Sequence, residues 1–189
     1  MLFPGGVLPL RIFEVRYMDM VRECMSRSSP FGVCLITRGN EVGTPADHEE
    51  VGCAAMIDDW DMTEPGVLQL RTVGAFRFRI LERSVQKDGL IRARAEPIAA
   101  DPEIEIPPEL AECALLMERA IEDLCRREPE SKKRPIAEPY LPASCGWVAN
   151  RLAELLPLAM PARQQLMALE DPLRRLALIH EALRREQVI

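Results

Sequence analysis

Nucleophilic chemistry needs a serine, threonine or cysteine held beside a base, and this chain offers few such arrangements. Its three lysines allow two local serine–lysine pairs, Ser84 with Lys87 and Ser131 with Lys132. The first pair lies at an expected hairpin turn, the second in a charged, proline-rich segment, and neither has an oxyanion motif around it. None of the lysines follows a glycine, which excludes a phosphate-binding loop of the Gly-Lys-Ser/Thr type. We therefore expect no enzymatic activity and no cofactor.

Histidine, cysteine and acidic residues are not spaced as metal ligands. No two of the six cysteines are separated by two residues, as paired zinc ligands commonly are. His48 lies in an expected loop, and His180 on an amphipathic helix where it would be packed or half exposed. The acidic run 58–64 lacks the spacing of a calcium loop. We expect no metal site, and the cysteines are predicted to be reduced, buried thiols.

Arginines gather on one predicted hairpin. Asp88-Gly89 is typical of a two-residue turn, which would place Lys87 opposite Leu90. Because side chains alternate between the two faces of a strand, one face is expected to carry Arg77, Arg79, Arg83, Arg92 and Arg94. The opposite face is expected to be the core side, with Phe76, Phe78 and Ile80.

This arginine face, defined by those five residues, has three interpretations. It could be a solvated surface paired with nearby acids such as Glu82 and Glu96, a docking surface for an acidic partner, or a nucleic-acid surface. The formal charge of −6, from 24 basic and 30 acidic side chains, argues against nucleic acid. Trp60 and Met62 could be exposed apolar anchors in an acidic loop, or they could fold back onto the core. The arginine face, Trp60 and Met62 are the candidate partner-binding residues.

The elements that must hold these residues fall into two halves. Residues 1–100 are expected to be mainly strands, with the strand segments at 31–36, 51–57, 67–73, 75–86 and 90–98. A turn is predicted at Gly5-Gly6, between a first and a second strand. A helix is expected to open near Glu14, because an apolar stripe follows helical spacing through Phe13, Tyr17, Met20, Val21 and Cys24.

The second half has the pattern of helices. Residues 101–108 are extended and form the predicted boundary between domains at 1–100 and 108–189. A helix is expected over 109–127, then a proline-rich segment, and a helix over 145–156 capped by Ser144. A short helix follows Pro161, and Asp171-Pro172 would open the last one, with Leu173 among its buried residues.

The opening segment resembles the beginning of the Lon protease N-terminal domain family. The positions that match the family's pattern are Leu2, Phe3, Pro4, Gly5, Leu8, Pro9, Leu10, Arg11, Ile12, Phe13, Glu14, Arg16 and Tyr17. The resemblance continues at 31–33, 51–57 and 74–80, with Cys53 and Met56 where the family usually has threonine and arginine. The carboxyl end is similar through Arg151, Leu152, Leu155, Leu156, Pro157, Gln165, Leu166, Asp171, Arg175 and Leu176. Nearly the whole chain is covered.

The resemblance implies an α+β fold, with a PUA-like β-pseudo-barrel followed by a C-terminal α-helical bundle. The family usually has a few more residues before the segment at Met1, so the first strand is expected to be short or frayed. Full-length Lon proteases continue into an ATPase and a serine–lysine peptidase domain, and neither is expected here. The family's domain handles protein substrates and performs no chemistry itself.

The leading hypothesis is a stand-alone, ATP-independent, non-enzymatic domain that binds unfolded or exposed protein segments and could act as an adaptor to a protease. The alternative is a PUA-like nucleic-acid-binding module that uses the arginine face, and a small hydrolase rests on no visible constellation. No signal peptide and no run of eighteen apolar residues is present, so we expect a cytoplasmic protein without membrane contact. The client, the partner and the oligomeric state stay open.

Overall fold

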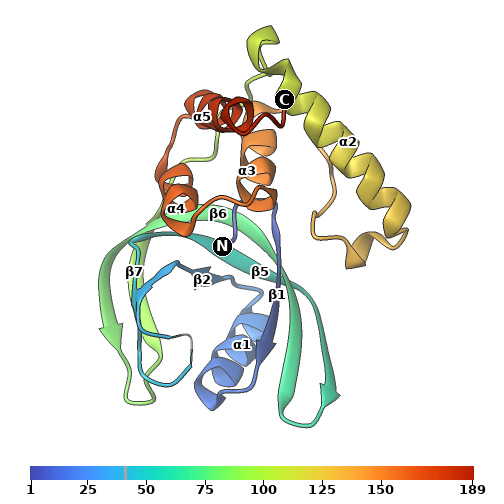
Figure 1. The fold of residues 1–189 in the computed structure, drawn as a ribbon. Coiled ribbons are helices and arrows are strands. Elements are labelled where there is room, and N and C mark those ends of the chain that lie inside the picture. Colours follow the sequence, from blue (N-terminus) through green and yellow to red (C-terminus); the bar gives the residue numbers. More distant parts are fainter. Residues whose placement is uncertain (41) are drawn as a thin grey trace. The chain divides into compact units, whose positions relative to one another are not determined.

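The computed structural model describes residues 1–40 and 42–189, which divide into two compact units, Met1–Ile98 and Ala99–Ile189. Strands dominate the first unit, drawn in blue to green in Figure 1, and helices dominate the second, in yellow to red. The predicted α+β class is therefore confirmed. None of the described helices has the length and apolar character needed to span a membrane.

The first unit is built on a five-stranded antiparallel sheet. Its strands are β1 (Val7–Ile12), β2 (Phe31–Val33), β5 (Val51–Glu64), β6 (Val67–Val85) and β7 (Ile91–Pro97). The strand order is β1-β6-β5-β2, and β7 pairs with the second half of β6. The strand predicted at 31–36 is broken after Val33, and its end forms a separate pair of β3 (Ile36–Arg38) with β4 (Asp47–His48).

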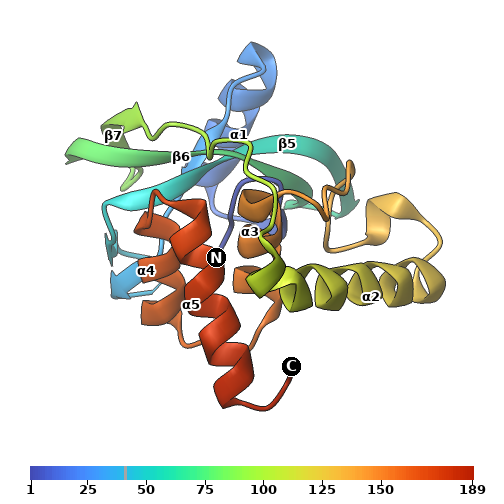
Figure 2. The ribbon, with the colours of Figure 1, turned by 90° about the horizontal axis from the view of Figure 1, so that it is seen from above.

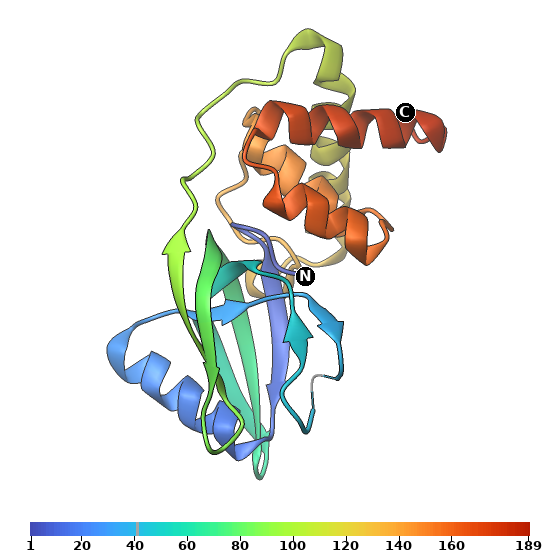
Figure 3. The same cartoon turned by 90° about the vertical axis from the view of Figure 1, so that its left-hand side faces the viewer.

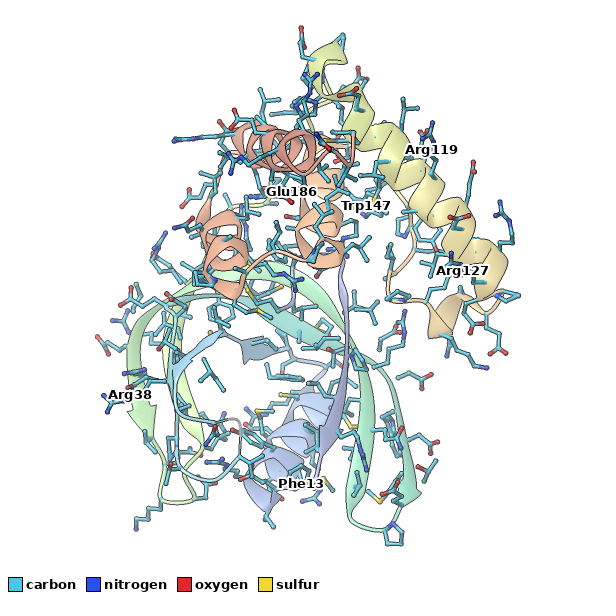
Figure 4. The ribbon with its side chains drawn as sticks, viewed as in Figure 1. Phe13, Arg38, Arg119, Arg127, Trp147 and Glu186 are labelled. Atoms are coloured by element: carbon cyan, nitrogen blue, oxygen red, sulfur yellow. The ribbon has the colours of Figure 1, made fainter. Side chains whose placement is uncertain are left out.

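Helix α1 (Val15–Arg27) fills the concave side of this sheet, which curves around it in Figure 1. Val21 packs with Leu68 and Leu70 in the core of the unit, and partly buried side chains from β1, β5 and α1 surround them. Burying such side chains contributes roughly 1.5–3 kcal/mol each. The predicted stripe holds for Val21 and Cys24, but Phe13 precedes the helix and is exposed (Figure 4).

Arg16 attaches the start of α1 to the loop after β6. Its buried guanidinium donates a hydrogen bond to the Gly89 carbonyl at 2.9 Å and lies 2.9 Å from the Glu14 carboxylate. A buried charge is tolerated where it is paired and hydrogen-bonded, which both contacts provide. Arg16 therefore acts as a structural clamp between two distant segments.

The chain before β1 is anchored without forming the predicted first strand. Leu2 and Phe3 are buried, and Gly5 adopts a positive φ of 76°. The Gly5 N–H donates to the Gly74 carbonyl, and the Gly74 N–H donates to the Gly6 carbonyl. A side chain at Gly74 would meet the Phe3 carbonyl oxygen at 2.1 Å, so this close approach requires glycine.

The predicted acidic loop at 58–64 is wrong, because β5 continues through Glu64. Only Pro65 and Gly66 form the turn, with Gly66 at φ 79° and Glu64 paired with Val67. Aspartate is uncommon in strands, so the sequence did not indicate that β5 extends beyond residue 57. β6 is likewise continuous across the expected break at Gly74.

The β6–β7 hairpin has a three-residue loop instead of the predicted two-residue turn. The Gln86 N–H donates to the Leu90 carbonyl, and the Gly89 N–H donates to the Gln86 carbonyl, with Gly89 at φ 84°. This is the hairpin type that places a left-handed residue in the last loop position. The extra residue shifts the register, so that Val85 lies opposite Ile91.

The second unit contains α2 (Ala111–Arg127), α3 (Cys145–Leu155), α4 (Met160–Ala168) and α5 (Pro172–Arg185), seen from a second side in Figure 2. Two short 3₁₀ turns cover Pro108–Leu110 and Ser131–Lys133. Ser144 caps α3 by accepting from the Trp147 N–H, and Asp171 caps α5 in the same way, both as predicted. Leu173, predicted to be buried, is exposed.

Arg175 is the polar centre of this unit. Its fully buried guanidinium makes a two-point ion pair with Asp101, at 2.7 and 3.2 Å. It also donates to the Asn150 side chain at 3.0 Å and to the carbonyls of Leu166 and Leu169. Arg175 thereby joins the chain before α2 to α3 and to the C-terminal end of α4. Figure 3 shows α4 and α5 from the side.

Candidate functional site

The outer edge of β5 is open over much of its length. β2 pairs only with Cys53–Ala55, and within residues 1–40 and 42–189 no strand continues the sheet beside residues 56–64. We call this segment, Met56–Glu64, the β5 edge. Unpaired strand edges present backbone N–H and C=O groups that can bind another extended chain.

Trp60 and Met62 are the exposed apolar side chains of the β5 edge, at 54% and 46% exposure. They are therefore not folded back onto the core. Trp60 lies directly opposite Leu70, which packs against Val21 in the core. Residues directly opposite each other project to the same face, so Trp60 extends the apolar face that α1 covers elsewhere.

Two aspartate side chains accept hydrogen bonds from the backbone of the same edge. The Trp60 N–H donates to the Asp59 carboxylate at 3.0 Å, and the Met62 N–H donates to the Asp61 carboxylate at 2.7 Å. The Gly74 N–H bonds to Gly6 on the β1 side of β6, and alternate residues of a strand direct their backbone groups to the same side, so the backbone of Leu70 also faces β1. The N–H groups of Trp60, opposite Leu70, and of Met62 therefore point away from β6. Charged residues at an edge are a common way of blocking indiscriminate strand pairing.

The remaining acidic residues of the hairpin are paired with arginines inside the unit. Asp58 contacts Arg71, and the Glu64 carboxylate lies 3.3 Å from the Arg11 guanidinium. The carboxylates of Asp59 and Asp61 accept hydrogen bonds from the backbone of the edge. These two residues are the ones placed to respond to an incoming chain.

The predicted arginine face forms only in part. A bulge between the pairs Cys53–Arg77 and Ala55–Gly74 inserts one residue into β6, and it leaves Phe76 exposed while Arg77 is buried. Phe76 was predicted in the core and Arg77 on the outer face, so both predictions are wrong.

A second bulge in β6, at Leu81, places Arg83 on a different face from Arg92 and Arg94. Arg92 and Arg94 lie opposite Ser84 and Glu82, whereas Arg83 lies opposite Ala93 and so projects to the other face. The sequence could not reveal this because each bulge reverses the alternation beyond it.

The arginines of the hairpin are engaged with acids of their own unit. Arg94 donates to Glu82 at 2.5 Å and Arg83 to Asp47 at 3.2 Å, while Arg79 lies opposite Glu96. Arg92 donates to Glu23 of α1 at 2.6 Å, and this hydrogen bond lowers the pKa of Glu23. The nucleic-acid alternative depended on one basic face of five arginines. With Arg77 buried and Arg83 on the opposite face, only three arginines share that face, and Glu96 lies among them. A partner-binding role for the individual arginines stays a prediction.

Three thiols and His180 have structural surroundings in the described part of the chain. Burial raises the pKa of Cys34, Cys113 and Cys145 to about 11, so these thiols stay protonated and unreactive near neutral pH. His180 Nε2 lies 3.0 Å from the Glu112 carboxylate, which links α5 to α2. In the described part of the chain, no group of three histidine, cysteine or acidic side chains could hold a metal ion.

The strand that forms the β5 edge could have been recognised from its alternating pattern, although its acidic residues are more typical of a loop. The segment Asp59-Trp60-Asp61-Met62 alternates strictly between acidic and apolar residues. Period-two alternation is typical of a half-exposed strand, whatever the polar residue is.

Trp147, the other tryptophan, lies on α3, and the centroid of its ring is 6.3 Å from that of Tyr140 (Figure 4).

Residues 1–185 match the family model of the ATP-dependent protease La (LON) substrate-binding domain. The crystal structure of a Lon N-terminal domain protein from Xanthomonas campestris is 34% identical, with a TM-score of 0.76, and the match covers 95% of this chain and 90% of that one.

Two curated relatives are longer proteins. The Lon protease of Syntrophus aciditrophicus (strain SB) is 26% identical over 183 residues, which are 92% of this chain and 22% of the relative. The protein cereblon of Gallus gallus is 27% identical over 139 residues, 71% of this chain and 28% of the relative. This chain therefore matches only about a quarter of the length of each. Because the family model spans almost all of the sequence, the chain belongs to the ATP-dependent protease La (LON) substrate-binding domain family.

Proposed function

We propose that this protein binds unfolded or exposed segments of other proteins and performs no chemistry on them. Membership of a substrate-binding domain family supports binding of protein substrates. The observation that carries the proposal is the β5 edge, where exposed apolar side chains stand on a strand edge that no other strand of the described residues pairs with. Extended chains are recognised at such edges through backbone hydrogen bonds and alternate side chains.

The proposal includes a role as an adaptor that brings clients to a protease, and a cytoplasmic location. The six cysteines are free thiols, which suits a reducing compartment. The buried, protonated thiols support a non-enzymatic protein. We also propose that the unit Met1–Ile98 is a PUA-like pseudo-barrel and that the unit Ala99–Ile189 is a helical bundle, because the curved sheet around α1 and the four α-helices suit this description.

The test compares one client protein in two states. A reduced and carboxymethylated protein, which cannot refold, is titrated against the full chain by calorimetry, and the native form of the same protein is the control. We expect micromolar or weaker binding of the unfolded form, no binding of the native form, and slower aggregation of the client when it is diluted from denaturant. Equal binding of both forms, or of neither, would contradict the proposal.

A further inference from the structure

We propose that the β5 edge binds its client by strand addition and selects extended segments in which apolar residues alternate with lysine or arginine. This inference rests on the proposed function and names the chemistry of its substrate. The β5 edge spans nine residues, about 30 Å of extended strand. That length can accommodate a segment of eight to ten residues in one continuous ladder.

The backbone step is an exchange of hydrogen-bond acceptors. In the free protein the N–H groups of Trp60 and Met62 are bonded to the carboxylates of Asp59 and Asp61. A carbonyl of the added strand takes the place of each carboxylate, so no N–H loses its partner when the client binds. Because a lost buried hydrogen bond is costly, this replacement keeps the site satisfied in both states.

The exchange sets the charge preference. Once displaced, the carboxylate of Asp61 needs a new partner. Asp59 and Asp61 alternate with Trp60 and Met62 along the strand and carry two negative charges. They therefore project to the opposite face from the two apolar side chains. A client residue on that face is best a lysine or arginine, since a charge-assisted pair replaces the hydrogen bond that the carboxylate gave up.

The other face sets the apolar preference. Trp60 lies opposite Leu70, and both project to the side of the sheet that α1 covers. Client side chains above Trp60 and Met62 remove apolar surface from water, and methionine adapts to side chains of different shape. Alternation in the client thus follows from alternation in Asp59-Trp60-Asp61-Met62.

A second copy of the same edge is a poorer occupant. Two β5 edges in antiparallel contact would bring acidic side chains of both copies close together, and like charges across strands are destabilising. The acidic residues therefore disfavour self-pairing while they favour a basic segment.

The first experiment varies the peptide and leaves the protein unchanged. Three ten-residue labelled peptides are titrated by fluorescence anisotropy: alternating valine and lysine, alternating valine and glutamate, and a scrambled valine–lysine sequence without alternation. We expect the alternating lysine peptide to bind at least tenfold more tightly than the other two, with an affinity that falls as salt rises. Equal binding of the alternating and scrambled lysine peptides would overturn strand addition.

Backbone methylation tests the ladder directly. Two further versions of the lysine peptide carry N-methyl groups at every second residue, either the valines or the lysines. Only alternate residues of an added strand bond to the edge, so one version is expected to lose binding and the other to keep it. Equal behaviour of the two versions would contradict the inference.

Protein variants locate the site. Asp59→Asn with Asp61→Asn should remove the preference for lysine, and Trp60→Ala with Met62→Ala should weaken binding at least tenfold. Leu81→Ala with Val85→Ala, at exposed apolar positions of β6, is the matched control and should bind as wild type does. Circular dichroism confirms that each variant is folded.

The outcomes separate the two proposals. If both edge variants bind the carboxymethylated client and the lysine peptide as wild type does, the edge is not the site, while the proposed function stands. If the wild type binds neither client nor peptide, the proposed function itself fails. If sedimentation shows a dimer that the peptide dissociates, the edge is occupied by a second copy and the inference is overturned.

Discussion

At the scale of single residues, the most constrained side chains are buried arginines. Arg16 and Arg175 both match the family pattern, and both hold distant segments together through several hydrogen bonds. The sequence shows them only as charged residues among apolar ones. Their partners, such as Gly89 and Asp101, lie 73 and 74 positions away, so local pattern could not predict the contacts.

Removing Asp101 should destabilise the protein strongly. Asp101→Ala leaves the Arg175 guanidinium buried without its carboxylate, and breaking a buried pair in this way costs about 3–5 kcal/mol. Urea unfolding followed by circular dichroism measures the loss. Asp123→Ala, which breaks the exposed pair with Arg126, is the control and should change the free energy of unfolding by less than about 1 kcal/mol. Equal effects of the two variants would contradict the role assigned to Asp101.

The buried thiols should make the protein less stable at alkaline pH. The folded pKa of Cys113 and of Cys145 is about 11, above the value of about 8.5 for an unfolded thiol. The unfolded chain therefore loses these protons first, and the free energy of unfolding falls as pH rises from about 8.5 to about 11. Below that window their contribution is complete. Unfolding measured from pH 7 to 11 should show a shallower decline in Cys113→Ala with Cys145→Ala, and an unchanged decline would refute this cause.

At the scale of elements, helix starts could be predicted from the sequence, because they depend on residues that are neighbours in the chain. Ser144 and Asp171-Pro172 mark helix starts because a cap needs only its own next few residues. The register of β6 with β5 and β7 was not predictable in the same way. It depends on bulges near Phe76 and at Leu81, and each bulge is set by packing across strands. The same reasoning explains why five arginines were expected on one face and only Arg79, Arg92 and Arg94 share it.

Gly74 should tolerate no side chain. In Gly74→Ala the new Cβ would lie 2.1 Å from the Phe3 carbonyl oxygen, so residues 1–6 must move away from β6. The hydrogen bonds of Gly5 and Gly6 with Gly74 would then be lost, together with the burial of Leu2 and Phe3. We expect a loss of about 2–5 kcal/mol, comparable to large core truncations, in urea unfolding. Ala75→Ser at the neighbouring exposed position is the control, and a change as small in Gly74→Ala as in that variant would contradict the contact.

At the scale of the whole molecule, each unit has a core of its own. The core of the first unit is centred on Val21, Leu68 and Leu70. The core of the second contains the hydrogen-bonded Arg175 side chain and the buried faces of α3 and α5. The family resemblance implied the α+β class, and the division into a strand-rich first half and a helical second half followed from periodicity, turn residues and helix caps. The β5 edge did not, since its acidic composition concealed the strand on which the proposed function rests.

Separate cores should give separate responses in amide hydrogen exchange. Exchange reports the free energy of opening for each segment, so a defect in one core should accelerate exchange mainly in the elements that share it. Asp101→Ala is expected to accelerate exchange in α3, α4 and α5, which meet at Arg175, and to leave β1, β5 and β6 close to wild type. Gly74→Ala should give the reverse pattern, because its clash lies against β6. Mass spectrometry of peptic fragments resolves these segments under native conditions. Uniform acceleration in both variants would show that the two units open as one cooperative body, and strand addition at β5 would then have to be coupled to the stability of the helices.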